Sequence, residues 1–262
     1  ACGGSGTLVQ KLAEKNVRTI PIPRLDRDIH LLDEVRVFFS LLSLFRKEHP
    51  GIIHLNSSKI GVLGALAARS YNLSEWLKPR AYRKTARIIF TVHGWPFQED
   101  RPAWQRAIIY AFSWLTVLLS HTAIAVSEYD ARIGRRMWGV GRKMVAIQNG
   151  IAAHAPIPKH DARKTLLGGR YSDIPQGAVW IGTISELTKN KGLAYGIEGI
   201  YELLRGGKSH RPVIFAVIGE EDERQRLEHL IARLGLERSV FLVGVKNDAV
   251  RLLSAFDIFL FP

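Results

Sequence analysis

Short hydrophobic runs alternate with longer amphipathic segments along most of this 262-residue chain. Runs of apolar and β-branched residues predict strands, whereas apolar residues that recur every three or four positions predict helices. In the first half, strands are expected at 18–22, 52–55, 88–92, 123–126 and 144–147. Helices are expected between them at 31–47, 59–69, 101–119 and 128–137. Four of these strands are apolar nearly throughout, which is typical of parallel strands covered on both faces.

The alternation is interrupted once, after Asn149-Gly150, by a segment rich in proline, glycine, alanine and basic residues. We therefore predict a first domain over 1–151, a linker region over 152–176 with one short helix at 161–167, and a second domain over 177–262. In the second domain, strands are expected at 179–183, 213–218, 240–243 and 258–261, and helices at 193–204, 221–234 and 248–256.

This β-α-β alternation predicts an α/β protein with a doubly wound parallel sheet in each domain. The sequence starts without a methionine and stops at Phe261-Pro262, directly after an apolar strand. A parallel strand normally continues into a covering helix, so we expect both domains to be incomplete.

Bulk composition is that of a soluble globular protein, with 47% hydrophobic and 23% charged residues. The single cysteine, Cys2, excludes a disulfide within the chain and fits a reducing, cytoplasmic setting. The longest apolar stretch, 107–119, is shorter than the roughly 20 residues of a membrane-spanning helix. A buried or amphipathic helix is expected there.

Charge is distributed unevenly along the chain. Residues 1–150 carry 22 Lys and Arg against 11 Asp and Glu, whereas residues 151–262 carry 15 against 13. The asymmetry suggests that the first half faces an anionic membrane surface, a pyrophosphate-bearing acceptor or nucleic acid. A basic surface that serves only solubility is the alternative.

The strongest concentration of basic residues lies between 69 and 87, where six of them accompany one acid, Glu75. The aromatic residues Tyr71, Trp76 and Tyr82 are interleaved with them. This mixture suits a membrane interface and equally suits a solvated loop. The candidate membrane or acceptor surface consists of Lys78, Arg80, Arg83 and Lys84.

Polar residues follow the predicted strands of the first domain. His93-Gly94 comes directly after the strand 88–92. The carboxyl ends of parallel strands line the ligand crevice of such folds. An imidazole there could donate to a substrate or exchange a proton, and glycine would permit a close approach. Capping of the strand end by His93 is the alternative, and Ser127 and Asn149-Gly150 similarly suit a helix N-cap and a simple turn.

The second domain repeats this arrangement. Gly182-Thr183 ends the first strand, and the following loop enters a helix beside Lys191. Free N–H groups and the dipole at a helix N-terminus favour an anion, and an ammonium there could balance a diphosphate. A merely solvated lysine is the alternative. Gly219-Glu220 follows the next strand in the same way, whereas metal-ligand spacings, P-loops and serine-hydrolase elbows are absent from the sequence.

Seven segments, in order, resemble bacterial glycosyltransferases of family 4, which have the GT-B fold. They are HLNSSKIGVLG (54–64), IFTVHGW (89–95), VSEYD (126–130), IQNGI (147–151), 181–193, 217–220 and DIFLFP (257–262). The resemblance covers the whole chain. Single segments are weakly specific, but the series is specific.

The resemblance implies an acceptor-binding first domain and a donor-binding second domain that face a cleft. His93 would lie near the transferred sugar, and Lys191 would neutralise the diphosphate of the donor. The remaining expected donor-binding residues are Gly182, Thr183, Gly219 and Glu220, and the expected cleft-lining residues are Gly94, Ser127, Asn149 and Gly150.

The same resemblance implies a UDP- or GDP-linked sugar as substrate, a lipid-linked or glycan acceptor, no bound metal or other cofactor, and no nucleic-acid partner. Transfer would retain the anomeric configuration. Many members of the family work at the cytoplasmic face of the membrane, so a cytoplasmic, peripheral protein at the inner face of the plasma membrane is expected.

The sequence departs from the family pattern at three points. Glu186 occupies the place where relatives often have arginine, five residues before the lysine. A pair of glutamates separated by seven residues is expected after Pro262, and the first strand with its glycine loop before Ala1. By this alignment Cys2–Gly6 is a later loop rather than a phosphate loop, and the chain alone is expected to be inactive.

Two other functions remain open at this point. A sugar-nucleotide 2-epimerase shares the GT-B architecture and would release product without an acceptor. A non-catalytic basic module that binds membranes or nucleic acid would show salt-dependent binding and no affinity for nucleotide sugars.

Overall fold

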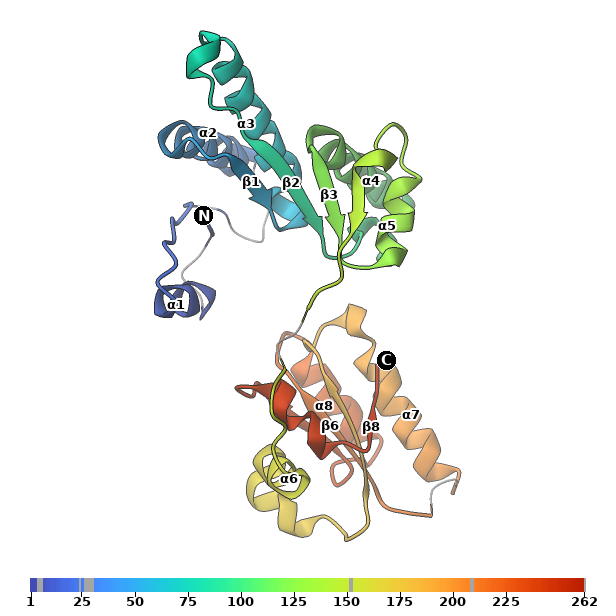
Figure 1. Ribbon diagram of the computed structural model, residues 1–262. Helices are drawn as coiled ribbons and strands as arrows, with labels where there is room; N and C mark the ends of the chain where they lie inside the picture. Colours follow the sequence, from blue (N-terminus) through green and yellow to red (C-terminus); the bar gives the residue numbers. More distant parts are fainter. Residues whose placement is uncertain (4–6, 24, 26–30, 151–152, 208–209, 262) are drawn as a thin grey trace. The chain divides into compact units, whose positions relative to one another are not determined.

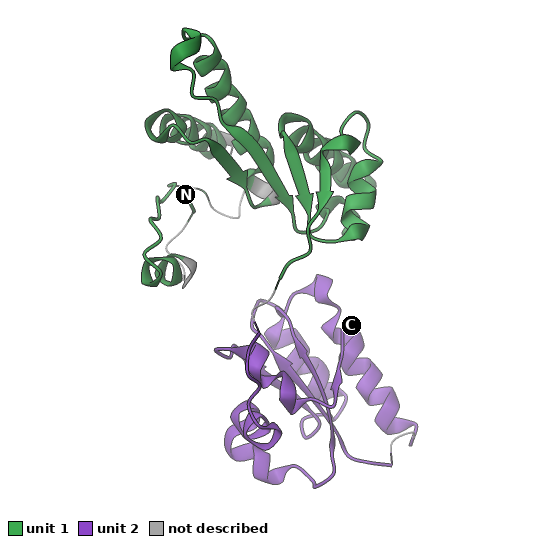
Figure 2. Ribbon diagram, viewed as in Figure 1, with its two compact units in different colours: residues 1–150 green, residues 151–262 purple. Residues whose placement is uncertain are grey.

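A computed structural model describes residues 1–3, 7–23, 25, 31–150, 153–207 and 210–261 of the chain. These residues form two compact units, 1–150 and 151–262 (Figures 1 and 2). Each unit is built on a four-stranded parallel sheet. The predicted α/β class with two parallel-sheet, Rossmann-like domains is therefore confirmed.

The sheet of the first unit has the order β1-β2-β3-β4. Its strands are β1 (Ile52–Leu55), β2 (Arg87–Val92), β3 (Thr122–Ala125) and β4 (Met144–Ala146). Its helices are α1 (Thr7–Glu14), α2 (Leu31–Glu48), α3 (Ser58–Trp76), α4 (Ala103–Leu119) and α5 (Glu128–Arg135). Because α3, α4 and α5 each connect two neighbouring parallel strands, they return the chain from the carboxyl edge of the sheet to its amino edge.

The sheet of the second unit has the order β7-β6-β5-β8. Its strands are β5 (Val179–Ile184), β6 (Val213–Ile218), β7 (Val240–Gly244) and β8 (Ile258–Phe259). Its helices are α6 (Lys159–Leu167), α7 (Leu193–Arg205) and α8 (Arg224–Arg233), with a 3₁₀ segment at Ala249–Ala255. The chain runs outward from β5 to β7 and then returns to the other side of β5, so a topological switch point lies between β5 and β8.

Two apolar cores cover the faces of the second sheet, and β6 is buried at all of its positions. Val213, Phe215 and Val217 face the core beneath α7 and α8. Ile214, Ala216 and Ile218 face the core that contains Trp180 and residues of α6. Alternate residues of one strand thus fill two cores, which explains the uninterrupted apolar run in its sequence.

The segment predicted as a linker, 152–176, differs from that expectation. Residues 151 and 152 lie outside the described residues, but α6 and the following 3₁₀ segment Gly168–Asp173 pack against the second unit. The Arg163 guanidinium lies 4.9 Å from the centre of the Trp180 ring. Asp257 accepts hydrogen bonds from Lys159, Arg163 and the Trp180 N–H. Most of the segment therefore belongs to the second unit.

Other elements also differ from the sequence prediction: α1 was not expected, and the strand expected at 258–261 is shortened to β8. The strand expected at 18–22 is reduced to a single bridge between Cys2 and Pro21. The helix expected at 248–256 is a 3₁₀ segment. The helix expected at 59–69 continues to Trp76 as part of α3, because its polar residues are paired: the Asn72 side chain forms hydrogen bonds with both backbone groups of Ala86.

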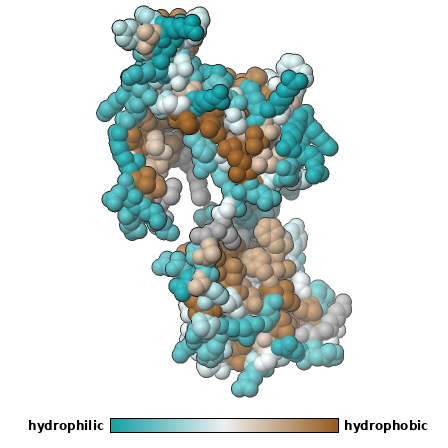
Figure 3. Space-filling model, viewed as in Figure 1, coloured by the Kyte–Doolittle hydropathy of each residue, from teal (hydrophilic) through white to brown (hydrophobic). Residues whose placement is uncertain are grey.

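The mixed polar and apolar surface visible in Figure 3 is ordinary for a globular protein, with hydrophobic side chains scattered among hydrophilic ones. Among the described residues, no helix combines the length and the hydrophobicity that crossing a membrane requires.

The close contact between Gly182 and Phe256 gives a stability prediction. A Cβ atom at Gly182, in the middle of β5, would overlap the Phe256 ring. We expect Gly182→Ala to lower the free energy of unfolding by about 1–3 kcal/mol, measured by urea denaturation.

Gly199→Ala is the matched control, because Gly199 lies in α7 and has no atom within 4 Å of the added methyl group. Alanine should stabilise that helix by about 0.5–1 kcal/mol. Equal effects of the two substitutions would contradict the packing of Phe256 against β5.

Candidate functional site

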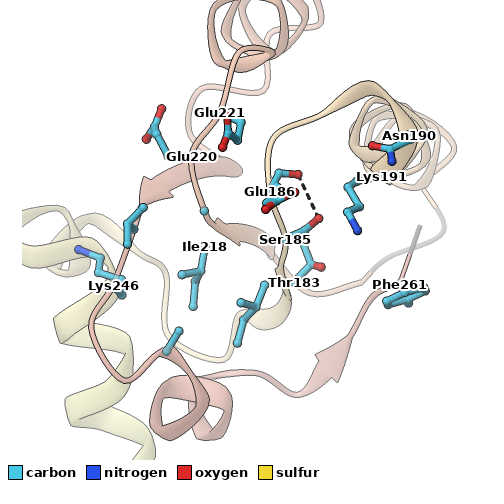
Figure 4. A pocket seen from close by; sticks show the side chains of 14 residues that line it. Thr183, Ser185, Glu186, Asn190, Lys191, Ile218, Glu220, Glu221, Lys246 and Phe261 are labelled. Atoms are coloured by element: carbon cyan, nitrogen blue, oxygen red, sulfur yellow. Dashed lines mark hydrogen bonds between the residues drawn. The ribbon is translucent and has the colours of Figure 1, made fainter. Parts of the chain in front are cut away.

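A pocket of the second unit lies at the carboxyl ends of its strands and has a volume of about 860 Å³ (Figure 4). It spans the switch point between β5 and β8, which is where ligands bind in open α/β sheets. Its lining residues are Thr183, Ile184, Ser185, Glu186, Asn190, Lys191, Ile218, Gly219, Glu220, Glu221, Val245, Lys246, Ala249 and Phe261.

Lys191 reaches this pocket from the entrance of α7. It ends a 3₁₀ turn, Lys189–Lys191, and Gly192 follows in the left-handed conformation that starts the helix. The first turn of α7 contains no acidic residue, and no side chain caps it. The positive end of the helix dipole and an exposed ammonium therefore lie together at one side of the pocket, an arrangement that favours an anion.

A second ammonium, that of Lys246, lines the pocket from the loop after β7 (Figure 4). Figure 4 shows Lys246 and Lys191 at opposite sides of the pocket. The sequence analysis missed Lys246, Asn190 and Phe261. The strand-end rule would also have found Lys246, which follows β7, whereas Phe261 was missed because the strand expected at 258–261 ends at Phe259 in β8.

Three carboxylates, those of Glu186, Glu220 and Glu221, also line the pocket. Glu220 is already paired, because the Arg224 guanidinium donates to both of its oxygens. These hydrogen bonds lower the pKa of Glu220 and raise that of Arg224, so the pair stays ionised at neutral pH. If Glu220 binds the donor as predicted, its carboxylate therefore does so while it is also bound to Arg224.

Of the two glycines predicted to bind the donor, one lines the pocket and the other does not. Gly219 lines the pocket with a φ of +152°, and a Cβ atom there would overlap the Ser185 carbonyl oxygen. Glycine thus allows β6 to approach the loop after β5. Gly182 lies inside β5 against Phe256 and is absent from the pocket lining, whereas its neighbour Thr183 is buried and lines the pocket.

In the first unit, His93 lies exposed directly after β2, at the carboxyl edge of the sheet. Its Nε2 is 3.0 Å from Oδ1 of Asn56, which follows β1 at the same edge. This contact joins two side chains, whereas the strand-end cap considered above would use a backbone hydrogen bond. Gly94 forms the turn after it with a φ of +137°. Asn56 was missed, although it also follows a strand.

The other predicted cleft-lining residues also follow strands of this sheet. Ser127 comes after β3 and caps α5: its Oγ accepts from the Asp130 N–H (3.0 Å) and donates to the Asp130 carboxylate (2.6 Å). The N-cap interpretation is thus confirmed. Asn149 and Gly150 are exposed after β4. Parallel pairing brings these residues to the edge that carries His93.

The predicted basic surface is elsewhere in the first unit. Lys78, Arg80, Arg83 and Lys84 follow the carboxyl end of α3, which lies at the amino edge of the sheet. They are therefore separated from His93 by the length of the sheet. Within the described residues, no group of three or more His, Cys, Asp or Glu side chains could hold a metal ion.

Comparison with known proteins matches one family model to the first unit and another to the second. The family model described as "Glycosyltransferase Family 4" matches residues 2–154, and that described as "Glycosyl transferases group 1" matches residues 171–262. Both matches together cover nearly the whole chain.

Among curated proteins, the chain is 25% identical over 269 residues to the UDP-Gal:alpha-D-GlcNAc-diphosphoundecaprenol alpha-1,3-galactosyltransferase of Escherichia coli, covering 100% of this chain and 64% of that protein. It is 20% identical to the capsular polysaccharide biosynthesis glycosyltransferase CapM of Staphylococcus aureus, over 91% of this chain and 59% of CapM. The chain thus spans less than two thirds of each of these relatives.

Among solved structures, Anabaena HepE in complex with UDP and glucose matches 98% of this chain and 64% of its own, with a TM-score of 0.71 and 17% identity. At this identity the likeness concerns the fold alone.

The cap at Ser127 gives a prediction about the stability of the first unit. Ser127→Ala removes the acceptor for the Asp130 N–H and should lower the free energy of unfolding by about 1 kcal/mol in urea denaturation. Ser127→Thr retains a hydroxyl and should recover most of this loss. Unchanged stability in the alanine variant would show that the cap contributes nothing.

Proposed function

Because the chain belongs to glycosyltransferase family 4, we propose that it serves to transfer a sugar from a nucleoside-diphosphate sugar to a lipid-linked or polysaccharide acceptor. Its fold is of the GT-B type, as the resemblance implied. The donor is a UDP-sugar in this proposal, since one curated relative is named for UDP-Gal and HepE is solved with UDP.

The single observation that carries the proposal is the pocket at the switch point of the second sheet. A nucleoside diphosphate needs a concave site with positive charge at one end, and the pocket has Lys191 together with the start of α7. Gly219 permits the backbone approach that shapes its wall.

Catalysis in this proposal depends on positioning and charge stabilisation. The reaction breaks the bond between the sugar and the β-phosphate, so negative charge develops on the departing diphosphate. Lys191 and the α7 N-terminus would stabilise that charge without a bound metal ion. His93, held beside Asn56, would contact the transferred sugar. Retention of the anomeric configuration is part of the proposal and follows from the family resemblance.

Glu186 lines the same pocket and carries a negative charge. A carboxylate beside a diphosphate is repulsive. Sugar and ribose hydroxyls, in contrast, donate hydrogen bonds to carboxylates. We assign Glu186 to hydroxyl groups of the donor, with the phosphates held on the Lys191 side of the pocket.

The donor proposal is tested by the affinity for UDP, measured by isothermal titration calorimetry. Lys191→Ala should weaken UDP binding about 10- to 100-fold, because a charged hydrogen-bond donor contributes roughly 1.5–3 kcal/mol. Lys189→Ala is the matched control: Lys189 belongs to the same 3₁₀ turn but does not line the pocket.

Lys189→Ala should leave the affinity for UDP unchanged. Glu186→Gln should weaken binding of UDP only modestly, because a neutral amide replaces the carboxylate that accepts hydrogen bonds from the donor hydroxyl groups. Equal affinities of the Lys191 and Lys189 variants would overturn the assignment of the diphosphate to the start of α7.

A further inference from the structure

The end of α3 and the segment after it form a projection of the first unit, which we call the α3 tip (residues 73–84; Figure 1). We propose that the α3 tip docks on the surface of an anionic phospholipid membrane. The inference rests on the proposed function in one respect: a lipid-linked acceptor lies at a membrane surface.

Four large apolar or aromatic side chains of the α3 tip are exposed. The exposed fractions are 61% for Leu73, 59% for Trp76, 73% for Leu77 and 72% for Tyr82. Exposing them to water is unfavourable, and a surface that collects them marks a contact site. Tryptophan and tyrosine are the side chains that favour the interface between lipid and water.

Basic side chains accompany this apolar group in the same segment, and the Arg83 guanidinium lies 5.2 Å from the centre of the Trp76 ring. Lys78, Arg80, Arg83 and Lys84 are all exposed. Glu75, the single acid between 69 and 87, has 1% of its surface exposed and is paired with the Lys78 ammonium at 2.5 Å. The exposed part of the tip therefore carries positive charge only, which complements anionic headgroups.

The α3 tip is held in shape by buried polar groups. Glu75 also accepts the Lys84 N–H (3.1 Å), and hydrogen bonds from Lys78 and Lys84 lower the pKa of its carboxyl. Tyr71 donates to the Lys84 carbonyl (2.6 Å), and Arg83 donates to the Lys78 carbonyl (3.0 Å). An ordered surface loses little conformational entropy on docking.

This geometry corrects part of the expectation from sequence. Tyr71 was expected on the interfacial surface, but it is fully buried in the core. Arg69 is half-buried and donates to the Leu119 carbonyl at the end of α4. The candidate surface is therefore shorter than the run 69–87 and begins at Leu73.

A second apolar group is exposed on α4, where Trp104, Ile108 and Phe112 follow one another at helical spacing. It lacks the charge that favours a membrane, because α4 contains one basic residue, Arg106, which donates to the Phe97 carbonyl. Charge complementarity thus selects the α3 tip, and α4 supplies a control.

The test is cosedimentation of the chain with phospholipid vesicles, without nucleotide. We expect binding to vesicles of equal parts phosphatidylcholine and phosphatidylglycerol, weak binding to phosphatidylcholine alone, and release by salt. Arg80→Gln should weaken the affinity about five-fold, since each basic residue near an anionic surface contributes a factor of roughly this size. Leu77→Ser should weaken it further by removing an inserted side chain.

Two variants outside the α3 tip are matched controls. Arg132→Gln removes one exposed charge from α5, and Ile108→Ser removes one exposed apolar side chain from α4. Neither should reduce vesicle binding as much as its counterpart in the tip. Equal losses in tip and control variants, or equal binding to neutral and anionic vesicles, would overturn the proposal.

UDP titration of the same variants keeps the two proposals separate. Arg80→Gln and Leu77→Ser should retain the affinity for UDP, because the pocket lies in the second unit, and an unchanged far-ultraviolet circular dichroism spectrum shows that the first unit is folded. A chain that binds UDP but not anionic vesicles refutes the α3 tip alone. A chain that binds vesicles through the tip but not UDP refutes the donor site alone.

Discussion

Parallel pairing of the strands is the constraint on which the rest of this structure depends. It brings the carboxyl ends of all strands in a sheet to one edge, so residues far apart in sequence become neighbours. Asn56 and His93 meet in this way although 37 positions separate them. In the second unit, β5 pairs with both β6 and β8, and the pocket opens where the chain direction changes beside it.

Two ionised carboxylates, those of Asp257 and Glu75, hold segments that lie outside the sheets. Burial alone would raise the pKa of Asp257, but hydrogen bonds from Lys159 and the Trp180 N–H, with the charge of Arg163, outweigh it and lower that pKa. The carboxylate thereby joins α6 to the β5 strand. Glu75 does the same for the α3 tip. In each case one ionised acid satisfies both a backbone N–H and a basic side chain, so an irregular segment keeps a defined shape.

The sequence predicted what depends on local periodicity and could not predict what depends on distant partners. Runs such as 213–218 are apolar at every position, so the strands and the residues that follow them were found. The extension of α3 was missed because Asn72 looks like a loop residue until Ala86 is known to pair with it. The predicted linker failed likewise, since α6 is held by Asp257, which lies far along the chain. Lys246 could have been predicted from the sequence, because it follows the end of a predicted strand as the other site residues do.

Charge in the pocket of the second unit decides how a donor can be oriented. Counting only side chains that line it, three carboxylates oppose two ammonium groups, which would repel a diphosphate. Arg224 neutralises Glu220 from outside the lining, and the start of α7 adds partial positive charge beside Lys191. Positive charge therefore lies at two sides of the pocket, with Lys191 and the start of α7 at one side and Lys246 at the other, and Glu186 and Glu221 remain as acceptors. A molecule with an anionic centre and hydroxyl groups on both sides matches this distribution better than a simple anion does.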